Sequence, residues 1–381
     1  MSVLSALRLS HAPVAGFVSV GLVWGCFAAQ VPVIKAHVGA GDALFGVLLL
    51  GTSIGLLSTM WIAPWMDRRL GTRAMPVAAI CLAAVFVLPG LAGTPLIFFM
   101  AMLLAGLGSG LLDVVMNARV SELEARHGRS LMNANHAMFS VAYAFAAILT
   151  GLGRELALPT TANFAVVSLL IILLSTRMRM PVEPVDHTAR KTRRFPWPVV
   201  LICGAIVLLA FFVEASVEAW SALHIERTLG GRAAEGAFGP AILGLTMAIG
   251  RFSGQAVSEQ FSEQMVIVFG TVMASLGAMI AATATSPALA YLGFGTMGLG
   301  ISVVGPMGLA LLGRSVAPEQ RTAAISRGAV IGFAGFVLAP AVMGLISGAF
   351  GLRIAFVMVG LLALGTPLLT LLLKKQAGQT G

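Results

Sequence analysis

Long apolar stretches separated by short polar turns run along the whole chain. A helix needs roughly 20 apolar residues to cross the hydrocarbon core of a bilayer. On that rule the sequence predicts twelve transmembrane helices, at about 13–36, 43–66, 74–92, 95–118, 134–155, 160–178, 196–222, 236–257, 264–284, 286–312, 325–348 and 352–374. Most turns between them are too short to hold a folded domain. We therefore predict an all-α integral membrane protein with no extramembrane domain.

The composition excludes most classes of soluble protein. Of the 381 residues, 58% are hydrophobic and only 10% are charged, against about 25% charged in average soluble proteins. The net charge of +9 could indicate nucleic-acid binding, but the basic residues lie in the turns between apolar stretches, so we expect no nucleic-acid partner. The three cysteines fall inside apolar stretches without metal-ligand spacing. Because the sequence has no phosphate-binding loop, nucleophile motif or metal-ligand cluster, we expect neither an enzyme nor a bound cofactor.

The positions of the basic residues predict how the chain crosses the membrane. With the N-terminus inside, most of the 24 Lys and Arg residues fall in the inside turns, which is the pattern of cytoplasmic loops. We therefore expect a multi-pass protein of the bacterial inner (cytoplasmic) membrane with both termini cytoplasmic. The first apolar stretch is too long for a signal peptide and has no cleavage site after it, so we expect it to remain as the first span.

The longest connection, residues 179–195, divides the chain near its midpoint. It holds the basic run Arg190–Arg194, which we interpret as part of a solvated linker near anionic lipid; a specific lipid or partner site is the alternative. We expect an N-terminal six-helix bundle (1–178), a cytoplasmic linker (179–195) and a C-terminal six-helix bundle (196–381) in a monomeric protein. One constant offset places Gly106–Gly108 on Gly298–Gly300 and Asp67 on Glu259, which indicates a parallel repeat.

The stretch Gly106–Asn117 stands out because it carries an acid inside an apolar span. Asp113 and Asn117 are four residues apart, so on a helix they share one face, one turn apart. The three glycines of Gly106–Gly110 leave the preceding turns almost bare, which allows another helix to approach closely. Because a carboxylate in a bilayer is costly, it should face a bundle interior or a wet cavity. We expect Asp113 to line a transport path and to carry a coupling proton.

Three further titratable side chains are candidates for proton coupling. Glu214 and Glu218 share one helix face in the seventh span. Counting along that span places Glu214 in the outer half of the bilayer and Glu218 near the outer boundary, where Trp220 would suit the interfacial belt. His136 begins the fifth span and could shuttle protons; a structural role at the helix entry is the alternative.

Polar side chains inside the apolar spans are candidates for solute binding. No Arg lies in the middle of a predicted span, which argues against a fixed anion site. The candidates are Gln30, Asn117, Asn133, Asn135, Tyr143 and Ser302.

The segment Asp67–Arg73, which follows the second span, resembles the cytoplasmic loop motif of the major facilitator superfamily, an Asp-Arg pair followed by Gly and basic residues. The resemblance implies two pseudo-symmetric six-helix bundles that rock about a central site. An acid at a helix end can pair with Arg across a moving interface. We therefore expect Asp67, Arg68 and Arg73 to act in gating, with Arg251 in the equivalent loop of the second half. Basic residues that serve only topology are the alternative.

A more specific resemblance lies in Asp113–Ala118 and Gly128–Ala137. These stretches look like the YbjJ-type, fucose-permease-like branch of that superfamily. In the fucose permease an acid four residues before an Asn on the fourth span is a protonation site, and Asp113 with Asn117 matches that pattern. The acid that the permease carries in its first span has no counterpart within Gly21–Pro32, so sugar specificity is not carried over.

Together these features predict a secondary active transporter that works by alternating access. We expect a symporter for proton-coupled uptake of a small neutral or polar organic solute, such as a sugar-like metabolite. Proton-driven efflux of an apolar or cationic compound is the alternative, as is a non-transporting membrane sensor with the same fold. The expected partners are the solute, protons and the lipid bilayer.

Overall fold

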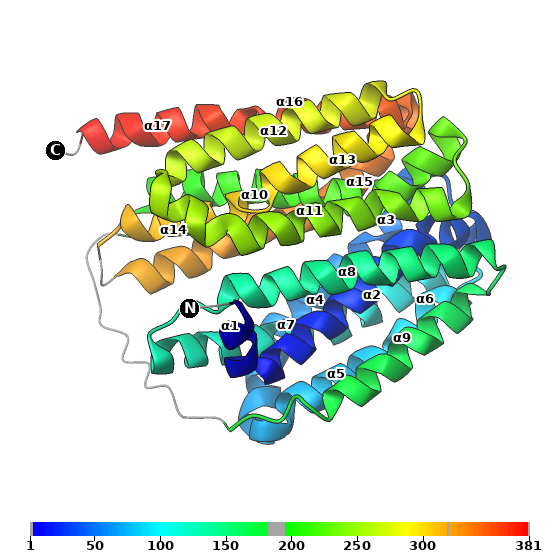
Figure 1. The fold of residues 1–381 in the computed structure, drawn as a ribbon, viewed down its shortest axis with the longest axis horizontal. Coiled ribbons are helices and arrows are strands. Elements are labelled where there is room, and N and C mark those ends of the chain that lie inside the picture. The colour runs from blue at the N-terminus through cyan, green and yellow to red at the C-terminus, as the bar shows by residue number, and fades with distance from the viewer. Residues whose placement is uncertain (1–2, 182–194, 318–319, 380–381) are drawn as a thin grey trace.

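The computed structural model describes residues 3–181, 195–317 and 320–379, and within these segments the chain is helical with no strand. Most of the predicted linker, including its basic run, lies outside the described residues. The described helices lie roughly parallel in two groups, one from each half of the chain (Figure 1). The termini lie at the same end of the molecule (Figure 1).

The first half of the chain supplies six spans. Its helices are α1 (Val3–Leu9), α2 (His11–Val38), α3 (Asp42–Leu48), α4 (Leu50–Leu70), the 3-10 turn η1 (Gly71–Arg73), α5 (Ala74–Phe86), α6 (Leu88–Leu91), α7 (Pro95–His127), α8 (Met132–Glu155) and α9 (Thr160–Ser175). Helices α3 and α4 together make one span, as do α5 and α6.

The second half also supplies six spans. Its helices are α10 (Trp197–Leu223), the π-helical turn η2 (His224–Thr228), α11 (Ala233–Gln260), α12 (Glu263–Thr283), α13 (Pro287–Ile301), α14 (Val304–Arg314), α15 (Arg321–Phe350), α16 (Leu352–Ala363) and α17 (Gly365–Gln379). Here α13 continues into α14 and α16 into α17. Across the described residues the predicted architecture of twelve helices in two bundles is confirmed.

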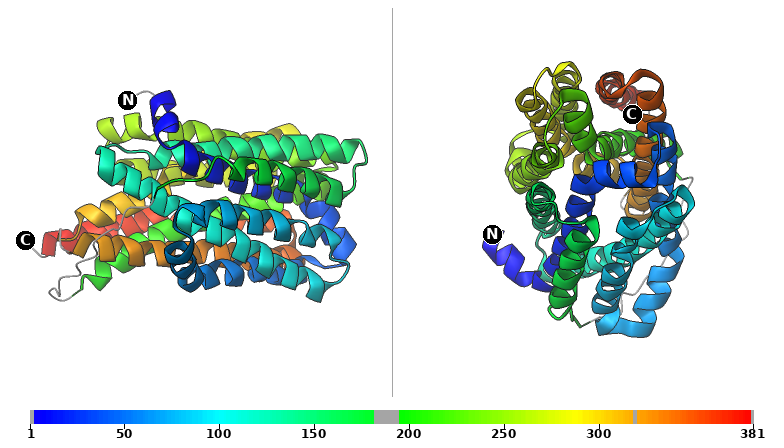
Figure 2. Two further views of the ribbon diagram at one scale, coloured as in Figure 1. Left: turned by 90° about the horizontal axis from the view of Figure 1, so that it is seen from below. Right: turned by 90° about the vertical axis from the view of Figure 1, so that its right-hand side faces the viewer.

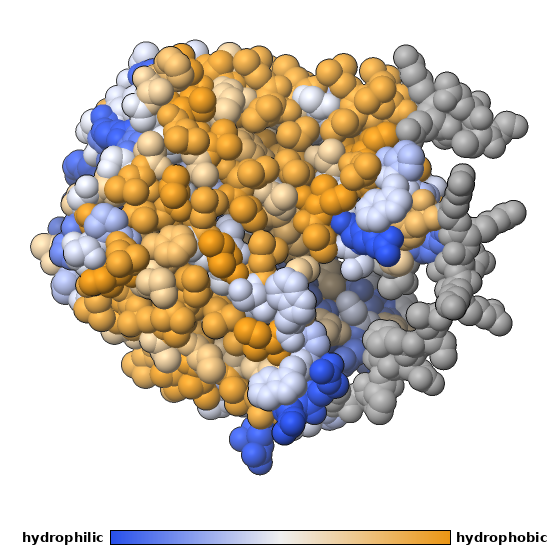
Figure 3. All heavy atoms as spheres, turned by 180° about the vertical axis from the view of Figure 1, so that it is seen from behind, coloured by the Kyte–Doolittle hydropathy of each residue, from blue (hydrophilic) through white to orange (hydrophobic). Residues whose placement is uncertain are grey.

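The exterior of the helix bundle is apolar, as a bilayer requires. A broad hydrophobic surface covers the face seen in Figure 3, with hydrophilic residues towards its two ends. Large apolar side chains such as Leu96, Phe269 and Leu368 are among the most exposed in the protein. In lipid such side chains need no protein partner, whereas every backbone N–H and C=O must be bonded within the helices.

Helices α4 and α7 approach each other closely through glycine. A Cβ atom added at Gly106 would lie 2.0 Å from the Thr52 carbonyl oxygen, and one added at Gly55 would lie 2.0 Å from the Leu103 carbonyl oxygen. Gly108 faces α5 instead, with its added Cβ 3.0 Å from the Leu82 Cα. The three-glycine face predicted from the sequence thus packs against two neighbouring helices, as small residues at membrane interfaces do.

At the end that carries the termini, which we name the inner end after the predicted topology, the first half holds a buried charge cluster. The Arg119 guanidinium is almost fully buried and donates to the carboxylates of Asp67 and, at 2.7 Å, Glu122. Helix α7 continues to His127, well beyond the predicted end near residue 118, and these charges neutralise one another along its extension. Asp67 thus pairs inside its own half, while Arg68 and Arg73 are exposed; a gating role for this loop stays a prediction.

The end opposite the termini, which we name the outer end after the predicted topology, is closed by ion pairs between the two halves. The Arg154 guanidinium on α8 forms a bidentate ion pair with the Glu226 carboxylate on η2, with N–O distances of 2.7 and 2.8 Å. Arg227, which follows Glu226, forms a second bidentate ion pair with the Asp42 carboxylate at the start of α3, with N–O distances of 2.6 and 2.5 Å. One π-helical turn therefore binds the first half at two places, and Ser347 and Lys35 also contact Asp42. We call these contacts the outer clasp.

Close backbone packing supports the outer clasp. Gly46 on α3 lies against α15, where its added Cβ would meet the Pro340 carbonyl oxygen at 2.4 Å. Gly151 on α8 lies against α11, where its added Cβ would meet Ala237 Cβ at 2.4 Å. At the end that carries the termini, Figure 3 shows a hollow in the surface. Figure 2 shows the two groups of helices from two further directions. The structure is closed at the outer end and open at the end of the termini.

Gly106→Ala is expected to destabilise the protein by about 1–3 kcal/mol or more, because the new methyl group would overlap the Thr52 carbonyl oxygen and overpack the interface. Thermal unfolding of the purified protein in detergent would measure the loss. Gly93→Ala is the matched control, since its added Cβ has no neighbour closer than 3.8 Å. Equal melting temperatures for the two variants would contradict this account of the α4–α7 contact.

Glu226→Gln is expected to shift the population towards a state open at the outer end. Breaking a buried ion pair by removing one partner costs roughly 3–5 kcal/mol, and here that cost falls only on the closed state. Spin labels at Leu156 and Phe350, which are exposed on opposite halves of this end, would report the separation by distance distributions. Glu235→Gln is the control, because its ion pair with Arg232 is exposed and lies within one half. An unchanged distribution in Glu226→Gln would show that the clasp does not hold this end closed.

Candidate functional site

A cavity of about 220 Å³ lies between the two halves. Helices α2, α4, α7 and α8 line it from the first half, and α10 and α15 from the second. Most of the lining is apolar, and aromatic rings are frequent. The aromatic residues are Trp24, Phe27, Phe139, Tyr143, Phe333 and Phe336. A concave, largely apolar site with a few polar groups is what small-molecule binding requires.

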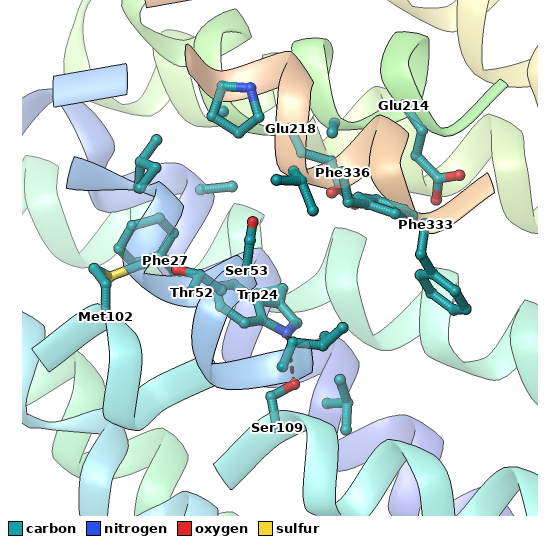
Figure 4. A pocket seen from close by; sticks show the side chains of 18 of the residues that line it. Trp24, Phe27, Thr52, Ser53, Met102, Ser109, Glu214, Glu218, Phe333 and Phe336 are labelled. Atoms are coloured by element: carbon teal, nitrogen blue, oxygen red, sulfur yellow. Dashed lines mark hydrogen bonds between the residues drawn. The ribbon is translucent and has the colours of Figure 1, made fainter. Parts of the chain in front are cut away.

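Three carboxyl groups line this cavity, and all three were predicted as proton-coupling residues. Asp113 comes from α7, and Glu214 and Glu218 come from α10. Figure 4 shows both glutamates across the cavity from Trp24 and Ser109. The structure therefore brings acids from both halves to one place between them.

Glu218 was expected near the outer boundary, and in the structure it belongs to the lining of the cavity. Helix α10 continues to Leu223 and is extended by η2, so Glu218 lies below the outer clasp and lines the cavity. Trp220 is fully buried and packs edge-on against Phe45, with ring centroids 6.2 Å apart. It therefore does not belong to an interfacial belt. The outer end of this span could not be located from hydropathy because its last polar residues bond to the other half.

Arg251 lies beside the cavity and links three helices. Its guanidinium donates to the Glu214 carboxylate at 3.1 Å, and to the Ser140 hydroxyl and the His136 carbonyl on α8. The arginine comes from α11, so this contact joins the two halves near the level of Glu214. A cation therefore does reach the centre of the bundle, although the sequence placed Arg251 in a loop as a gating residue. The Arg251 guanidinium therefore neutralises the charge of the Glu214 carboxylate.

Asp113 has the partner that its spacing predicted. The Asn117 side-chain amide donates to the Asp113 carboxylate at 3.1 Å and to its backbone carbonyl at 2.9 Å. The amide is therefore turned towards the acid of its own helix. No ion pair to Asp113 is found among the described residues.

Tyr143 is held at the cavity by two glycines on neighbouring helices. A Cβ added at Gly25 on α2 would lie 2.0 Å from the Tyr143 carbonyl oxygen, and one added at Gly244 on α11 would lie 2.8 Å from its ring. Only glycine at these two positions lets both helices approach the tyrosine so closely. The Tyr143 hydroxyl is buried, and within the described part of the chain it has no hydrogen-bond partner.

The other residues predicted for solute binding do not line this cavity. Gln30 is buried and accepts a hydrogen bond from Thr160 at 3.1 Å. Asn135 is also buried, where its amide donates to the Ser10 hydroxyl and the Leu131 carbonyl at 2.9 Å. Ser302 donates to the Leu299 carbonyl and lies against Gly250. Asn133 is half-buried in the first turn of α8. Their roles in binding stay predictions.

His136 also lies outside the cavity lining. Its ring packs edge-on against Phe17, with ring centroids 4.7 Å apart, and its backbone carbonyl accepts from Arg251. A proton-shuttle role for this side chain stays a prediction. In the described part of the chain no group of three His, Cys, Asp or Glu residues is placed to hold a metal ion.

Four polar cavity residues were missed from the sequence, namely Trp24, Thr52, Ser53 and Ser109. Trp24 donates through its indole N–H to the Ser109 hydroxyl at 3.0 Å, which ties α2 to α7 (Figure 4). Ser109 lies one helical turn before Asp113, so the face shared with that acid could have indicated it. Thr52 faces the cavity from α4 with a buried hydroxyl that has no hydrogen-bond partner among the described residues. An isolated Thr in an apolar span carries no such signal.

Comparison with known proteins agrees with this architecture. The sequence profile of the Major Facilitator Superfamily matches residues 14–294 and 200–380. The chain is 31% identical over 361 residues to an uncharacterised MFS-type transporter of Yersinia pestis, covering 91% of each. Its fold is similar to that of a bacterial homologue of the human lysosomal transporter Spinster in an inward-facing conformation, with a TM-score of 0.77, 16% identity and 98% and 96% coverage. A D-xylose–proton symporter has a TM-score of 0.76 at 15% identity, with 97% of each chain covered.

The sequence match runs through both halves, and the twelve spans with a cavity between them are the arrangement that such proteins share. The chain therefore belongs to the Major Facilitator Superfamily of membrane transporters.

Proposed function

We propose that this protein is a proton-coupled secondary transporter that moves a small organic solute by alternating access. The observation that carries the proposal is the cavity between the halves, to which the two halves contribute three carboxyl groups. A cavity at the interface of two rocking bundles is reached from one side of the membrane at a time. The same carboxyls can bind protons there, so solute and proton share one site.

Asp113 is the preferred carrier of the coupling proton. A charged acid at the centre of a span costs about 2.5–3.5 kcal/mol on insertion scales, and the neutral Asn117 amide is its partner in the structure. A closed, dry cavity therefore favours the protonated carboxyl, whereas opening to water on the low-proton side favours proton release. Gain or loss of the proton at Asp113 therefore shifts the equilibrium between the closed and open conformations, as proton coupling requires.

The lining of the cavity favours export of an apolar or cationic compound over uptake of a polar solute. A sugar-like molecule needs many hydrogen-bonding side chains, whereas here aromatic and aliphatic groups surround a few acids and hydroxyls. Uptake of a neutral or polar metabolite, as in a symporter, therefore becomes the second candidate. The resemblance of Asp113–Ala118 to the fucose-permease-like branch supports a common protonation site rather than a common substrate.

The arrangement in the membrane belongs to the same proposal. Positive-inside topology places both termini in the cytoplasm of a bacterium, so the end that is open in the structure faces the cytoplasm and the outer clasp faces outwards. The monomer would then work as an N-terminal bundle (1–178) and a C-terminal bundle (196–381) joined by a cytoplasmic linker (179–195).

Asp113→Asn is expected to abolish transport driven by a pH gradient while passive exchange persists, because the amide keeps the shape but cannot release a proton. Proteoliposomes would be loaded with a defined mixture of sugars, alcohols and amines, and their contents followed by mass spectrometry. For the parent protein, a gradient of one pH unit should change the steady-state ratio of a transported solute by up to roughly tenfold. The variant should show a ratio near one.

Glu235→Gln is the matched control, since this acid lies at the outer end of α11 and does not line the cavity. It should behave like the parent. If Asp113→Asn concentrates solute as well as the parent does, Asp113 is a structural acid and Glu218 becomes the candidate carrier. The absence of flux for every solute in the mixture would instead support a membrane sensor.

A further inference from the structure

Two of the three cavity carboxyls form no ion pair among the described residues. Glu214 is paired with Arg251 at 3.1 Å. Asp113 is bonded to the uncharged Asn117 amide, and Glu218 has no ion pair or hydrogen bond within the described segments. An acid without a cation is costly in a bilayer. These two groups therefore require either protons or a positively charged ligand.

The other charged and titratable groups around the cavity do not meet this requirement. Arg251 on α11 bonds to Glu214 and to α8, and it acts on Glu218 through space without forming an ion pair with it. His136 on α8 lies behind the lining against Phe17. Tyr143, also on α8, is uncharged and close enough to Glu214 and Glu218 to interact with them electrostatically. From α2, α4 and α15 the cavity receives no charged side chain among its lining residues.

The remainder of the lining suits an organic cation. Aromatic rings on α2 and α15 face the cavity (Figure 4), and Phe139 and Tyr143 on α8 belong to its lining. A ring face attracts a cation placed over it. The apolar surface would accept the body of the ligand. A metal ion would instead need a cluster of oxygen or nitrogen ligands, and the described residues contain no group of three acidic, His or Cys side chains so placed.

Two buried hydroxyls point to the kind of cation. The Tyr143 Oη and Thr52 Oγ1 atoms both belong to cavity-lining residues and lack hydrogen-bond partners in the described structure. Tyr143 is only 1% exposed. Hydroxyl oxygens accept hydrogen bonds, so an ammonium group with N–H donors would satisfy them together with the carboxylates. A quaternary ammonium has no such donors.

We infer that the cavity selects a small primary ammonium compound with an apolar body, bound by Asp113 and Glu218 and by the hydroxyls of Thr52 and Tyr143. The inference deepens the proposed function and rests on it. The cavity volume of about 220 Å³ limits the ligand to a small molecule. Binding of the cation releases the proton that otherwise neutralises a carboxyl, and return of the proton releases the cation. Export of the ammonium compound is then driven by inward movement of protons.

Binding of phenethylammonium to the purified full-length protein tests the inference. Two ligands serve as comparisons, namely phenylpropanol, which is uncharged and of similar size, and trimethylated phenethylammonium, which has no N–H and is larger by three methyl groups. Isothermal titration calorimetry should show the primary ammonium binding at least about tenfold more tightly than either. With one proton released per cation bound, its Kd should increase by up to about tenfold per pH unit of acidification between about pH 8 and about pH 6.

Equal affinity for the alcohol, equal affinity for the trimethylated ion, or a Kd that does not change with pH would each overturn the inference. Failure of phenethylammonium to bind would overturn it as well. Glu218→Gln and Asp113→Asn should each weaken binding at least about tenfold, because each removes a carboxyl group that either carries the negative charge or accepts an N–H of the ammonium. Tyr143→Phe should weaken it by about threefold, because it removes only an oxygen atom. The control Glu235→Gln should leave Kd unchanged.

Thermal unfolding would identify any variant that fails to fold. If an acid variant is misfolded, the affinity of Tyr143→Phe for phenethylammonium still tests the site. Parent-like affinity in both Glu218→Gln and Asp113→Asn would overturn the assignment of these acids. Ammonium binding with the expected pH dependence, but without transport driven by a pH gradient, would leave the inference standing and defeat the proposed function. Gradient-driven flux of a neutral solute without ammonium binding would defeat the inference alone.

Discussion

A charge inside a bilayer needs an opposite charge or a proton, and the polar interior of this protein is organised by that requirement. Arg119 meets Asp67 and Glu122, Arg154 meets Glu226, and Glu214 meets Arg251. Removing one member of such a buried pair costs roughly 3–5 kcal/mol, because the other member is left uncompensated in low dielectric. Asp113 and Glu218 differ from the other buried acids because neither forms an ion pair among the described residues, and both line the cavity. We therefore expect protons and a charged ligand to bind at the carboxyls of Asp113 and Glu218, which no ion pair in the described part of the chain neutralises.

The position of the ion pairs decides which end of the molecule is closed. At the inner end Arg119 pairs inside the first half, so the pair survives any rocking of one half against the other. At the outer end Glu226 and Arg227 belong to the second half and their partners to the first. Both come from one π-helical turn, and such turns inside helices are frequent at functional sites. The outer pairs have to break if the halves separate there, which makes their strength part of the conformational equilibrium.

Glycine allows these contacts to form. Backbone atoms of α4 and α7 meet at Gly106, and those of α3 and α15 meet at Gly46. The first contact holds one half together, whereas the second lies between the halves, so the same device serves both stability and closure. At the site itself, Gly25 and Gly244 let α2 and α11 enclose Tyr143. Small residues bring backbones close enough for dispersion to act between helices that gain nothing from the hydrophobic effect in lipid.

The sequence by itself determined the fold class, the twelve spans and the Asp113–Asn117 pair, because each depends on local properties. Span length follows from bilayer thickness, and residues four apart on a helix share a face whatever surrounds them. It did not determine that Arg251 reaches Glu214, that Glu218 lies at the cavity, or that Gln30, Asn135 and Ser302 bond away from it. These outcomes depend on the rotation of each helix about its axis and on its neighbours. Only tertiary packing decides them, because the apolar residues of a membrane span surround the helix and leave its buried face without a clear signature.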